Sequence, residues 1–153
     1  MMIQATQEMP ECNTTDREVA DILNESRIIA VIGLSPNPEK DSNRVGRYLQ
    51  DHGYRIVPVN PAHPEILGEK SYPRLTDIPF EVDVADIFRK TEAIPEVVDE
   101  AIKKKVKTVW MQLGLSHGES CAKALEAGIK VVQNKCMRLE HIRVEGAGGD
   151  AEA

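Results

Sequence analysis

The sequence has no long apolar run and no net positive charge. Its longest apolar run covers residues 28–32, far below the ~20 residues that a membrane-spanning helix needs. The formal net charge is −6, whereas a nucleic-acid-binding surface needs a net basic face. We therefore expect neither a membrane nor a nucleic acid as a partner.

The sequence also has few cysteines and no export signal. Its three cysteines, Cys12, Cys121 and Cys136, have the spacing of neither a metal site nor a redox motif. Residues 1–13 contain no basic region followed by an apolar stretch, so we expect no signal peptide. An odd number of cysteines without an export signal is typical of a reducing compartment. These absences predict a cytoplasmic protein.

Motifs for catalysis and for metal binding are missing as well. The four histidines, at positions 52, 63, 117 and 141, are not spaced as paired metal ligands, and no Ser, His and Asp are placed as a triad. The glycine-rich fingerprint of dinucleotide-binding proteins is absent, because only Gly33 and Gly46 flank a much longer loop. We expect no metal and assign no catalytic residue.

What is present is an alternation of strand and helix patterns in a chain of 153 residues, which is enough for one domain. Helices between strands require right-handed crossovers and a mainly parallel sheet. We predict an α/β fold, a Rossmann-type doubly wound five-stranded parallel sheet in the order 3-2-1-4-5, with helices on both faces. The domain is expected over residues 14–145, between flexible tails at 1–13 and 146–153.

The individual elements follow from periodicity and from start and stop signals. Thr15 to Glu18 form a capping box for the first helix, and Ser42 or Asn43 is expected to cap the second. Ser116 to Glu119 form another capping box, for a helix that Gly128 ends. Strands are expected at 28–32, 55–59, 82–88, 106–113 and 129–132, with a third helix around 94–102 and a proline-rich excursion at 61–81 that includes a short strand near 70–72.

In this fold class, ligands bind outside the carboxyl ends of the strands. The rule selects the segments 33–44, 59–63, 88–91, 112–116 and 133–136. Gly33 lets backbone approach a pyrophosphate, Ser35 and Ser42 offer hydroxyl groups, and the following helix start attracts anions. The second strand ends in Asn60 and not in the carboxylate that NAD would use, which disfavours NAD.

Five short motifs in these segments resemble the CoA-binding domain family, the Rossmann module also found at the start of the succinyl-CoA synthetase α subunit. The similarity runs from about Val19 to His141. Residues 134–135 are Asn-Lys where many relatives have Asp-Arg. The family's phosphohistidine-bearing second domain is not expected here. The motifs are Ala30-Val31-Ile32-Gly33-Leu34-Ser35 with Ser42-Asn43, Val57-Pro58-Val59-Asn60-Pro61, Val84-Ala85-Asp86-Ile87-Phe88-Arg89, Val109-Trp110-Met111-Gln112-Leu113-Gly114 and Val131-Val132-Gln133-Asn134-Lys135-Cys136.

The resemblance implies that coenzyme A (CoA) or an acyl-CoA lies across the strand ends. It assigns the pyrophosphate to the first-strand loop, the adenosine to the end of the second strand, and the adenine or the pantetheine arm to the third. The implied cofactor-binding residues are Gly33, Leu34, Ser35, Ser42, Asn43, Arg44, Val59, Asn60, Pro61, Phe88, Arg89, Gln112 and Gly114.

The leading interpretation is a CoA-binding module without catalysis that carries, senses or protects the cofactor, with homo-oligomerisation left open. One alternative is an NAD(P)-binding, oxidoreductase-like protein. Another is an enzyme that processes acyl-CoA with Cys136 or His117. A fourth is a partner-binding subunit that has lost its ligand, which predicts a loop too closed for any nucleotide.

Overall fold

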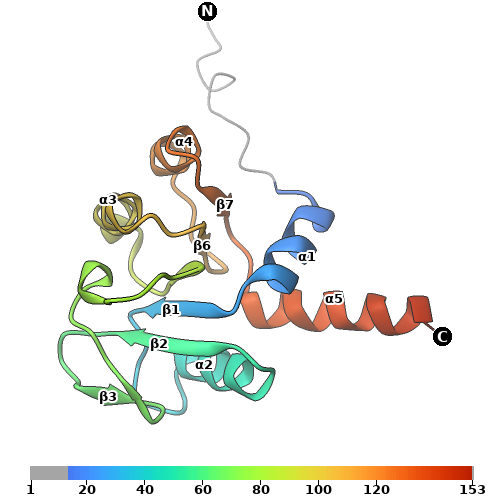
Figure 1. The fold of residues 1–153 in the computed structure, drawn as a ribbon, viewed down its shortest axis with the longest axis horizontal. Helices are drawn as coiled ribbons and strands as arrows, with labels where there is room; N and C mark the ends of the chain where they lie inside the picture. Colours follow the sequence, from blue (N-terminus) through green and yellow to red (C-terminus); the bar gives the residue numbers. More distant parts are fainter. Residues whose placement is uncertain (1–13, 153) are drawn as a thin grey trace, which may run out of the picture.

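The computed structural model describes residues 14–152, and the side chains of residues 14–146. A five-stranded parallel sheet forms its centre (Figure 1). The spatial order is β2 (Arg55–Val59), β1 (Ile28–Ile32), β5 (Val84–Ile87), β6 (Thr108–Met111) and β7 (Lys130–Val132). All four neighbouring pairs are parallel. The α/β class and the parallel sheet are confirmed.

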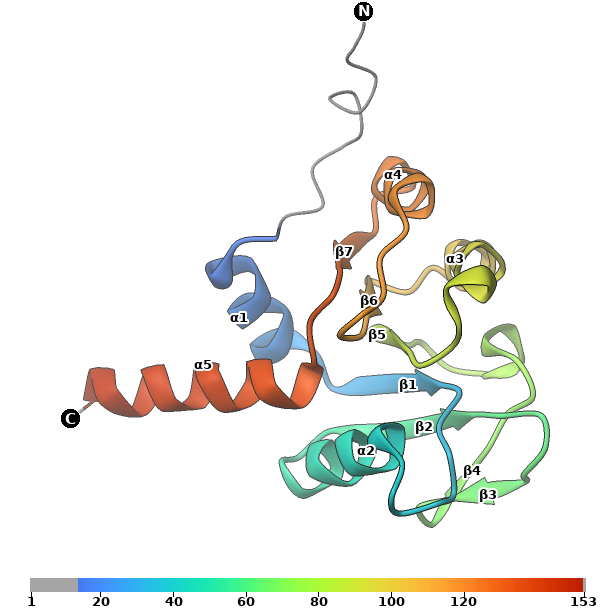
Figure 2. The same cartoon turned by 180° about the vertical axis from the view of Figure 1, so that it is seen from behind.

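Helices cover both faces of this sheet (Figures 1 and 2). One face packs against α1 (Asp16–Glu25), α2 (Asp41–Asp51) and α5 (Met137–Glu152). The other packs against α3 (Ile94–Lys104) and α4 (Gly118–Glu126). Since each face has its own apolar cluster, the strands are apolar on both sides, as expected for a parallel sheet that is covered twice. Among the described residues, no helix has both the length and the apolar character that crossing a membrane requires.

The strand order needs one correction. Tyr72, which belongs to no named strand, forms an isolated parallel bridge with Val59, the last residue of β2. If the segment at Tyr72 is counted as strand 3, the sheet consists of this segment, β2, β1, β5, β6 and β7 in that spatial order. The first five then have the order 3-2-1-4-5, and β7 is a sixth strand. The segment 82–88, which the sequence analysis counted as third, therefore lies beside β1 and occupies the fourth position. The sequence analysis expected a short strand near 70–72 but did not assign it to the sheet, because a single bridge leaves no apolar run.

The excursion after β2 contains more local structure than one short strand. It has a hairpin of β3 (Glu65–Ile66) and β4 (Glu69–Lys70), followed by the 3-10 helix Leu75–Asp77. A second 3-10 helix, Thr91–Ala93, leads into α3. Ile66, Leu75 and Ile78 are buried, so this excursion covers the sheet edge and contributes to the core.

The helix starts agree only in part with the predicted caps. The Thr15 capping box of α1 is confirmed. For α4 the N-cap is His117, whose side chain accepts from the backbone N–H of Ser120, and not Ser116. For α2 the N-cap is Lys40, so neither Ser42 nor Asn43 caps that helix. Both are instead inside its first turn, where they bond to the preceding loop.

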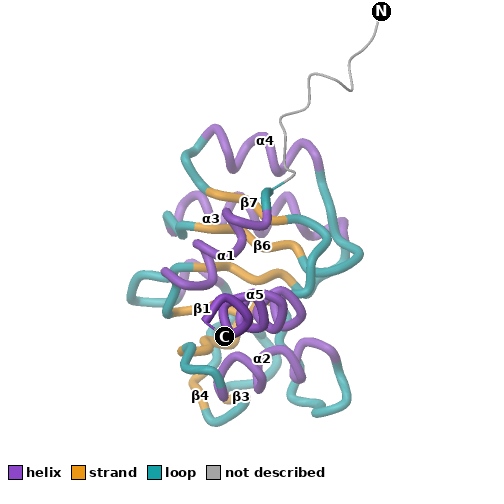
Figure 3. Tube along the Cα trace, turned by 90° about the vertical axis from the view of Figure 1, so that its right-hand side faces the viewer, coloured by secondary structure: helices purple, strands orange, loops and turns teal. Residues whose placement is uncertain are grey.

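The end of the chain also differs from the prediction. Residues 137–152 form α5, which lies between α1 and α2 on one face of the sheet (Figure 3). The domain was predicted to end at 145, but the helix continues to Glu152. Of the α5 side chains that the structure describes, at positions 137–146, only Met137 and His141 are buried, which leaves little apolar periodicity to detect in the sequence. The predicted tail at 1–13 lies outside the described residues.

Candidate functional site

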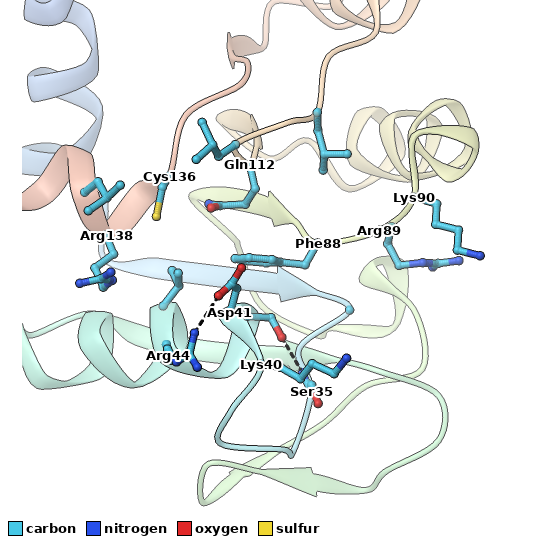
Figure 4. Close-up of a pocket in the computed structure, with 16 residues that line it drawn as sticks. Ser35, Lys40, Asp41, Arg44, Phe88, Arg89, Lys90, Gln112, Cys136 and Arg138 are labelled. Atoms are coloured by element: carbon cyan, nitrogen blue, oxygen red, sulfur yellow. Dashed lines mark hydrogen bonds and ion pairs between the residues drawn. The ribbon is translucent and has the colours of Figure 1, made fainter.

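A cavity of about 770 Å³ opens at the carboxyl ends of the strands (Figure 4). Its walls come from the loop after β1, the start of α2, the segments after β5 and β6, and the start of α5. This is the edge at which the fold rule places ligands. The lining residues are Gly33, Ser35, Lys40, Asp41, Ser42, Arg44, Val45, Phe88, Arg89, Lys90, Gln112, Leu113, Leu115, Cys136, Arg138 and Leu139.

Side-chain hydrogen bonds hold the loop between β1 and α2 in one shape. Ser42 Oγ accepts from the backbone N–H of Ser35 at 2.9 Å, and Asn43 Nδ2 donates to the Ser35 carbonyl at 2.8 Å. Within the loop, Ser35 Oγ accepts from the Asn37 N–H. The loop is therefore tied to the first turn of α2, a helix start that attracts anions.

Gly33 is required by the backbone as well as by the pocket. Its φ is +90°, a conformation that residues with a Cβ rarely adopt. A Cβ built at this position would overlap the carbonyl oxygen of Phe88, the residue that follows β5. Gly33 therefore lets β1 and β5 lie close together at the pocket edge, whether or not a ligand is bound.

The pocket is strongly basic although the chain is acidic. Its lining includes five cationic side chains and one carboxylate, Asp41, whereas the whole chain has a net charge of −6. Asp41 forms an ion pair with Arg44 at 3.0 Å. Figure 4 shows the cations around the cavity, with Arg138 and Arg44 at one end and Arg89 and Lys90 at the other. The cationic residues are Lys40, Arg44, Arg89, Lys90 and Arg138.

The inner wall is formed by Phe88 and Gln112, and behind it lies a buried carboxyl group. Gln112 is 5% exposed and donates from Nε2 to Asp86 Oδ1 at 2.6 Å. Asp86 is fully buried, and burial raises its pKa to about 7 although the hydrogen bond from Gln112 acts in the opposite direction. The other carboxylate oxygen, Oδ2, has no hydrogen-bond partner among the described residues.

Seven of the predicted residues line the cavity, and six do not. The seven are Gly33, Ser35, Ser42, Arg44, Phe88, Arg89 and Gln112. The six are Leu34, Asn43, Val59, Asn60, Pro61 and Gly114. Whether any of these thirteen contacts a ligand stays a prediction.

Several of the six residues support the site from behind. Leu34 and Val59 are in the core. Asn60 Nδ2 donates to the Leu34 carbonyl at 2.9 Å, and Asn60 Oδ1 accepts from the Ala62 N–H. The amide of Asn60 therefore ties the loop after β1 to the end of β2. Gly114 N donates to Asn134 Oδ1 at 2.7 Å, which joins the segments after β6 and β7.

The sequence analysis missed some lining residues. Arg138 and Leu139 belong to α5, which was not predicted as a helix, so their selection would have needed the position of that helix. Lys40 and Asp41 fall inside the selected segment 33–44 but were not among the thirteen residues. The remaining additions are Val45, Lys90, Leu113 and Leu115.

The two candidate nucleophiles are in different places. Cys136 is a free thiol that lines the cavity. His117 is not among the lining residues, because its side chain caps α4. Within the described part of the chain, no group of three His, Cys, Asp or Glu side chains is placed to hold a metal ion.

A Rossmann-type sheet with a basic pocket at its strand ends is typical of the nucleotide-binding class of proteins. Comparison with known families gives the particular family. Residues 27–142 match the model described as "CoA binding domain", so the chain belongs to the CoA-binding domain family.

The relatives are small proteins and parts of larger ones. The chain is 36% identical to the uncharacterized protein YneT of Bacillus subtilis, with 84% of this chain and 96% of YneT covered. It is also 36% identical to an ADP-forming acetate–CoA ligase of Archaeoglobus fulgidus, but over only 12% of that protein and 53% of this chain. A hypothetical protein from Pyrococcus horikoshii has the same fold, with a TM-score of 0.84, 42% identity, and 94% of this chain and 99% of that chain covered.

Proposed function

We propose that the protein binds CoA or an acyl-CoA in this pocket and performs no catalysis of its own. The observation that carries the proposal is the charge of the pocket, with five cations and one carboxylate in a chain of net charge −6. CoA has three phosphate groups, and cationic side chains bind phosphates through charge-assisted hydrogen bonds. Family membership favours CoA over other phosphorylated nucleotides.

The chemistry of the lining also fits the two ends of such a ligand. The phosphates would lie near the start of α2 and the cations, where the helix N-terminus adds to the attraction. The pantetheine arm would pass along Phe88 and Gln112 toward Leu115 and Cys136. Since CoA combines several negative charges with a long uncharged arm, a pocket that has both cationic and apolar walls suits it better than a uniformly polar one would.

A carrier, sensor or protective role is favoured over catalysis. An acyl-transfer enzyme would need a nucleophile with a general base within hydrogen-bond reach. Cys136 lines the cavity, but His117, the other candidate residue, is engaged at the start of α4. The acyl-CoA-processing alternative therefore loses one of its two candidate residues, and Cys136 alone would have to act.

Calorimetric titration with CoA, dephospho-CoA and NAD tests the proposal. CoA should bind more tightly than dephospho-CoA, because the 3′-phosphate is a partner for the cations. NAD should bind more weakly than either. Tighter binding of NAD than of CoA would mean that the ligand is wrongly assigned.

A matched pair of variants tests the location. Lys90→Ala removes an exposed cation of the pocket, and Lys103→Ala removes an exposed cation on α3 that does not line it. Lys90→Ala should weaken CoA binding about twofold to fivefold, the usual effect of one exposed charge pair, and Lys103→Ala should leave it unchanged. Equal affinities for the two variants would place CoA elsewhere.

A further inference from the structure

The buried carboxyl group of Asp86 is joined to the pocket through a single side chain. Asp86 is on β5, and its partners across the sheet are Val31 on β1 and Trp110 on β6. Neither neighbour can bond to a carboxylate oxygen at Asp86, since Val31 is apolar and the Trp110 indole N–H donates to the Lys135 carbonyl. The one hydrogen bond of the Asp86 side chain among the described residues comes from Gln112.

Gln112 has one end toward Asp86 and lines the pocket as well. Figure 4 shows Gln112 at the wall of the cavity. Its Nε2 donates to Asp86, which leaves Oε1 as a hydrogen-bond acceptor for the cavity side. An ionised carboxylate only accepts, so it holds the amide in this orientation. A protonated Asp86 gains an O–H donor, and since Oδ2 has no partner among the described residues, the acceptor within reach of this donor is Gln112 Oε1. The amide then turns over and offers its NH₂ group to the cavity.

We propose that Asp86 is a positioning residue that determines, through Gln112, whether the inner wall of the pocket offers a ligand an acceptor or a donor. The proposal rests on the proposed function for the ligand, CoA. With Asp86 ionised, the wall accepts from an N–H or O–H group, and the pantetheine arm carries two amide N–H groups and one hydroxyl group. The ionised form therefore binds CoA more tightly, and the affinity falls as Asp86 gains a proton.

The burial of Asp86 sets the pH at which this change occurs. Burial raises the pKa of Asp86 to about 7, against the hydrogen bond from Gln112. Other titratable groups are on the same face of the sheet or around the cavity. Burial raises the pKa of the partly buried Tyr48 and Tyr54 and lowers the pKa of His141. Glu145 on α5 and His52 at the end of α2 also act on His141. The groups around the cavity are Cys136, Lys40, Asp41, Arg44, Arg89, Lys90 and Arg138.

The test is the CoA affinity of four proteins at pH 6.0 and pH 8.5, measured by calorimetry. If the turned amide costs roughly tenfold in affinity, about the upper value for one hydrogen bond, wild type should bind about fivefold more tightly at the higher pH. Asp86→Asn carries an NH₂ donor at every pH and no titratable group, so it should bind weakly and lose this dependence. Gln112→Leu should lose it as well. Asp51→Asn, at an exposed position of α2 away from the pocket, should keep the wild-type dependence.

Because all four proteins meet the same CoA, the titration of the CoA phosphates contributes equally and cancels in the comparison. Absence of CoA binding to wild type at pH 8.5 would contradict the proposed function. Clear binding with the same pH dependence in wild type and in Asp86→Asn would overturn the role of Asp86 and leave the function standing.

A second measurement uses the unaltered protein, in case the variants do not fold. The pKa of Asp86, followed by the carbon-13 shift of its carboxyl group, should fall when CoA saturates the protein, since a ligand that prefers the ionised form must release the proton. An unchanged pKa in the saturated protein would overturn the proposal.

Discussion

Replacing Asp86 with asparagine should stabilise the fold, and the gain should increase with pH. The carboxyl group is fully buried and only one of its oxygens has a hydrogen-bond partner among the described residues. Burial raises its pKa from 3.8 to about 7. A difference of one in pKa corresponds to about 1.4 kcal/mol, so above pH 7 the buried carboxylate costs on the order of 4 kcal/mol. An asparagine has the same shape and carries no charge.

The sign of the pH effect follows from the protons that each state binds. Between its ordinary pKa and about 7, the folded protein keeps the Asp86 proton that the unfolded chain has released. The stability that Asp86 contributes is complete below its unfolded pKa and is lost as the pH rises toward 7. The advantage of Asp86→Asn over wild type should therefore grow by about 2–3 kcal/mol between pH 5 and pH 8.

Urea unfolding at pH 5, 6.5 and 8 measures this advantage as a difference between two proteins. Groups that titrate in both proteins, His141 among them, cancel in the difference. Asp51→Asn replaces an exposed carboxylate and serves as the control; its difference from wild type should be small and independent of pH. A free-energy difference between Asp86→Asn and wild type that is the same at pH 5 and pH 8 would refute the reasoning, because it would mean that Asp86 is ionised in the fold throughout.

Two further predictions concern backbone strain and a second buried group. Gly33→Ala should destabilise the protein by about 2–4 kcal/mol in urea unfolding, because of the φ of +90° and the overlap with the Phe88 carbonyl. The control Gly53→Ala, at a position with a similar φ and open space around it, should cost less. Equal losses of stability in the two variants would contradict the overlap. Burial lowers the pKa of His141, so the unfolded chain takes up a proton first and wild type should lose stability as pH falls below 6.5. His141→Phe should lose less over the same range, and parallel pH curves for the two proteins would contradict this.

The sheet could be predicted from the sequence because burial on both faces leaves continuous apolar runs. Residues 28–32 and 55–59 were predicted with the bounds that β1 and β2 have. The runs at 82–88 and 106–113 were predicted too long, since the apolar pattern continues past the strand ends into flanking residues, some of them buried, that are not in strands. Val82 and Val106, for example, are core residues before β5 and β6.

The site was predicted less well, because polar side chains have several ways to be satisfied. The fold rule selected five segments, and four of them contribute to the cavity lining, but the segment 59–63 does not. Asn60 bonds to the backbone of Leu34 and of Ala62. Ser42 and Asn43 looked like helix caps but fasten the loop at Ser35. Short polar side chains bond equally well to a helix end, to a neighbouring loop or to a ligand, and the sequence does not distinguish these partners.

The pair of Asp86 and Gln112 shows what only the register of the sheet can add. In the sequence, Asp86 is one carboxylate in an apolar strand, and Gln112 follows another strand 26 positions later. The parallel register places Asp86 beside Trp110. Since side chains alternate between the faces of a strand, residue 112 returns to the face of residue 110, within hydrogen-bond distance of Asp86. The carboxylate therefore costs stability where it stands, yet the same register gives it a contact with the ligand edge. A residue that is retained at such a cost is a candidate for function, and the stability of Asp86→Asn and its CoA binding should change in opposite directions at pH 8 if both arguments hold.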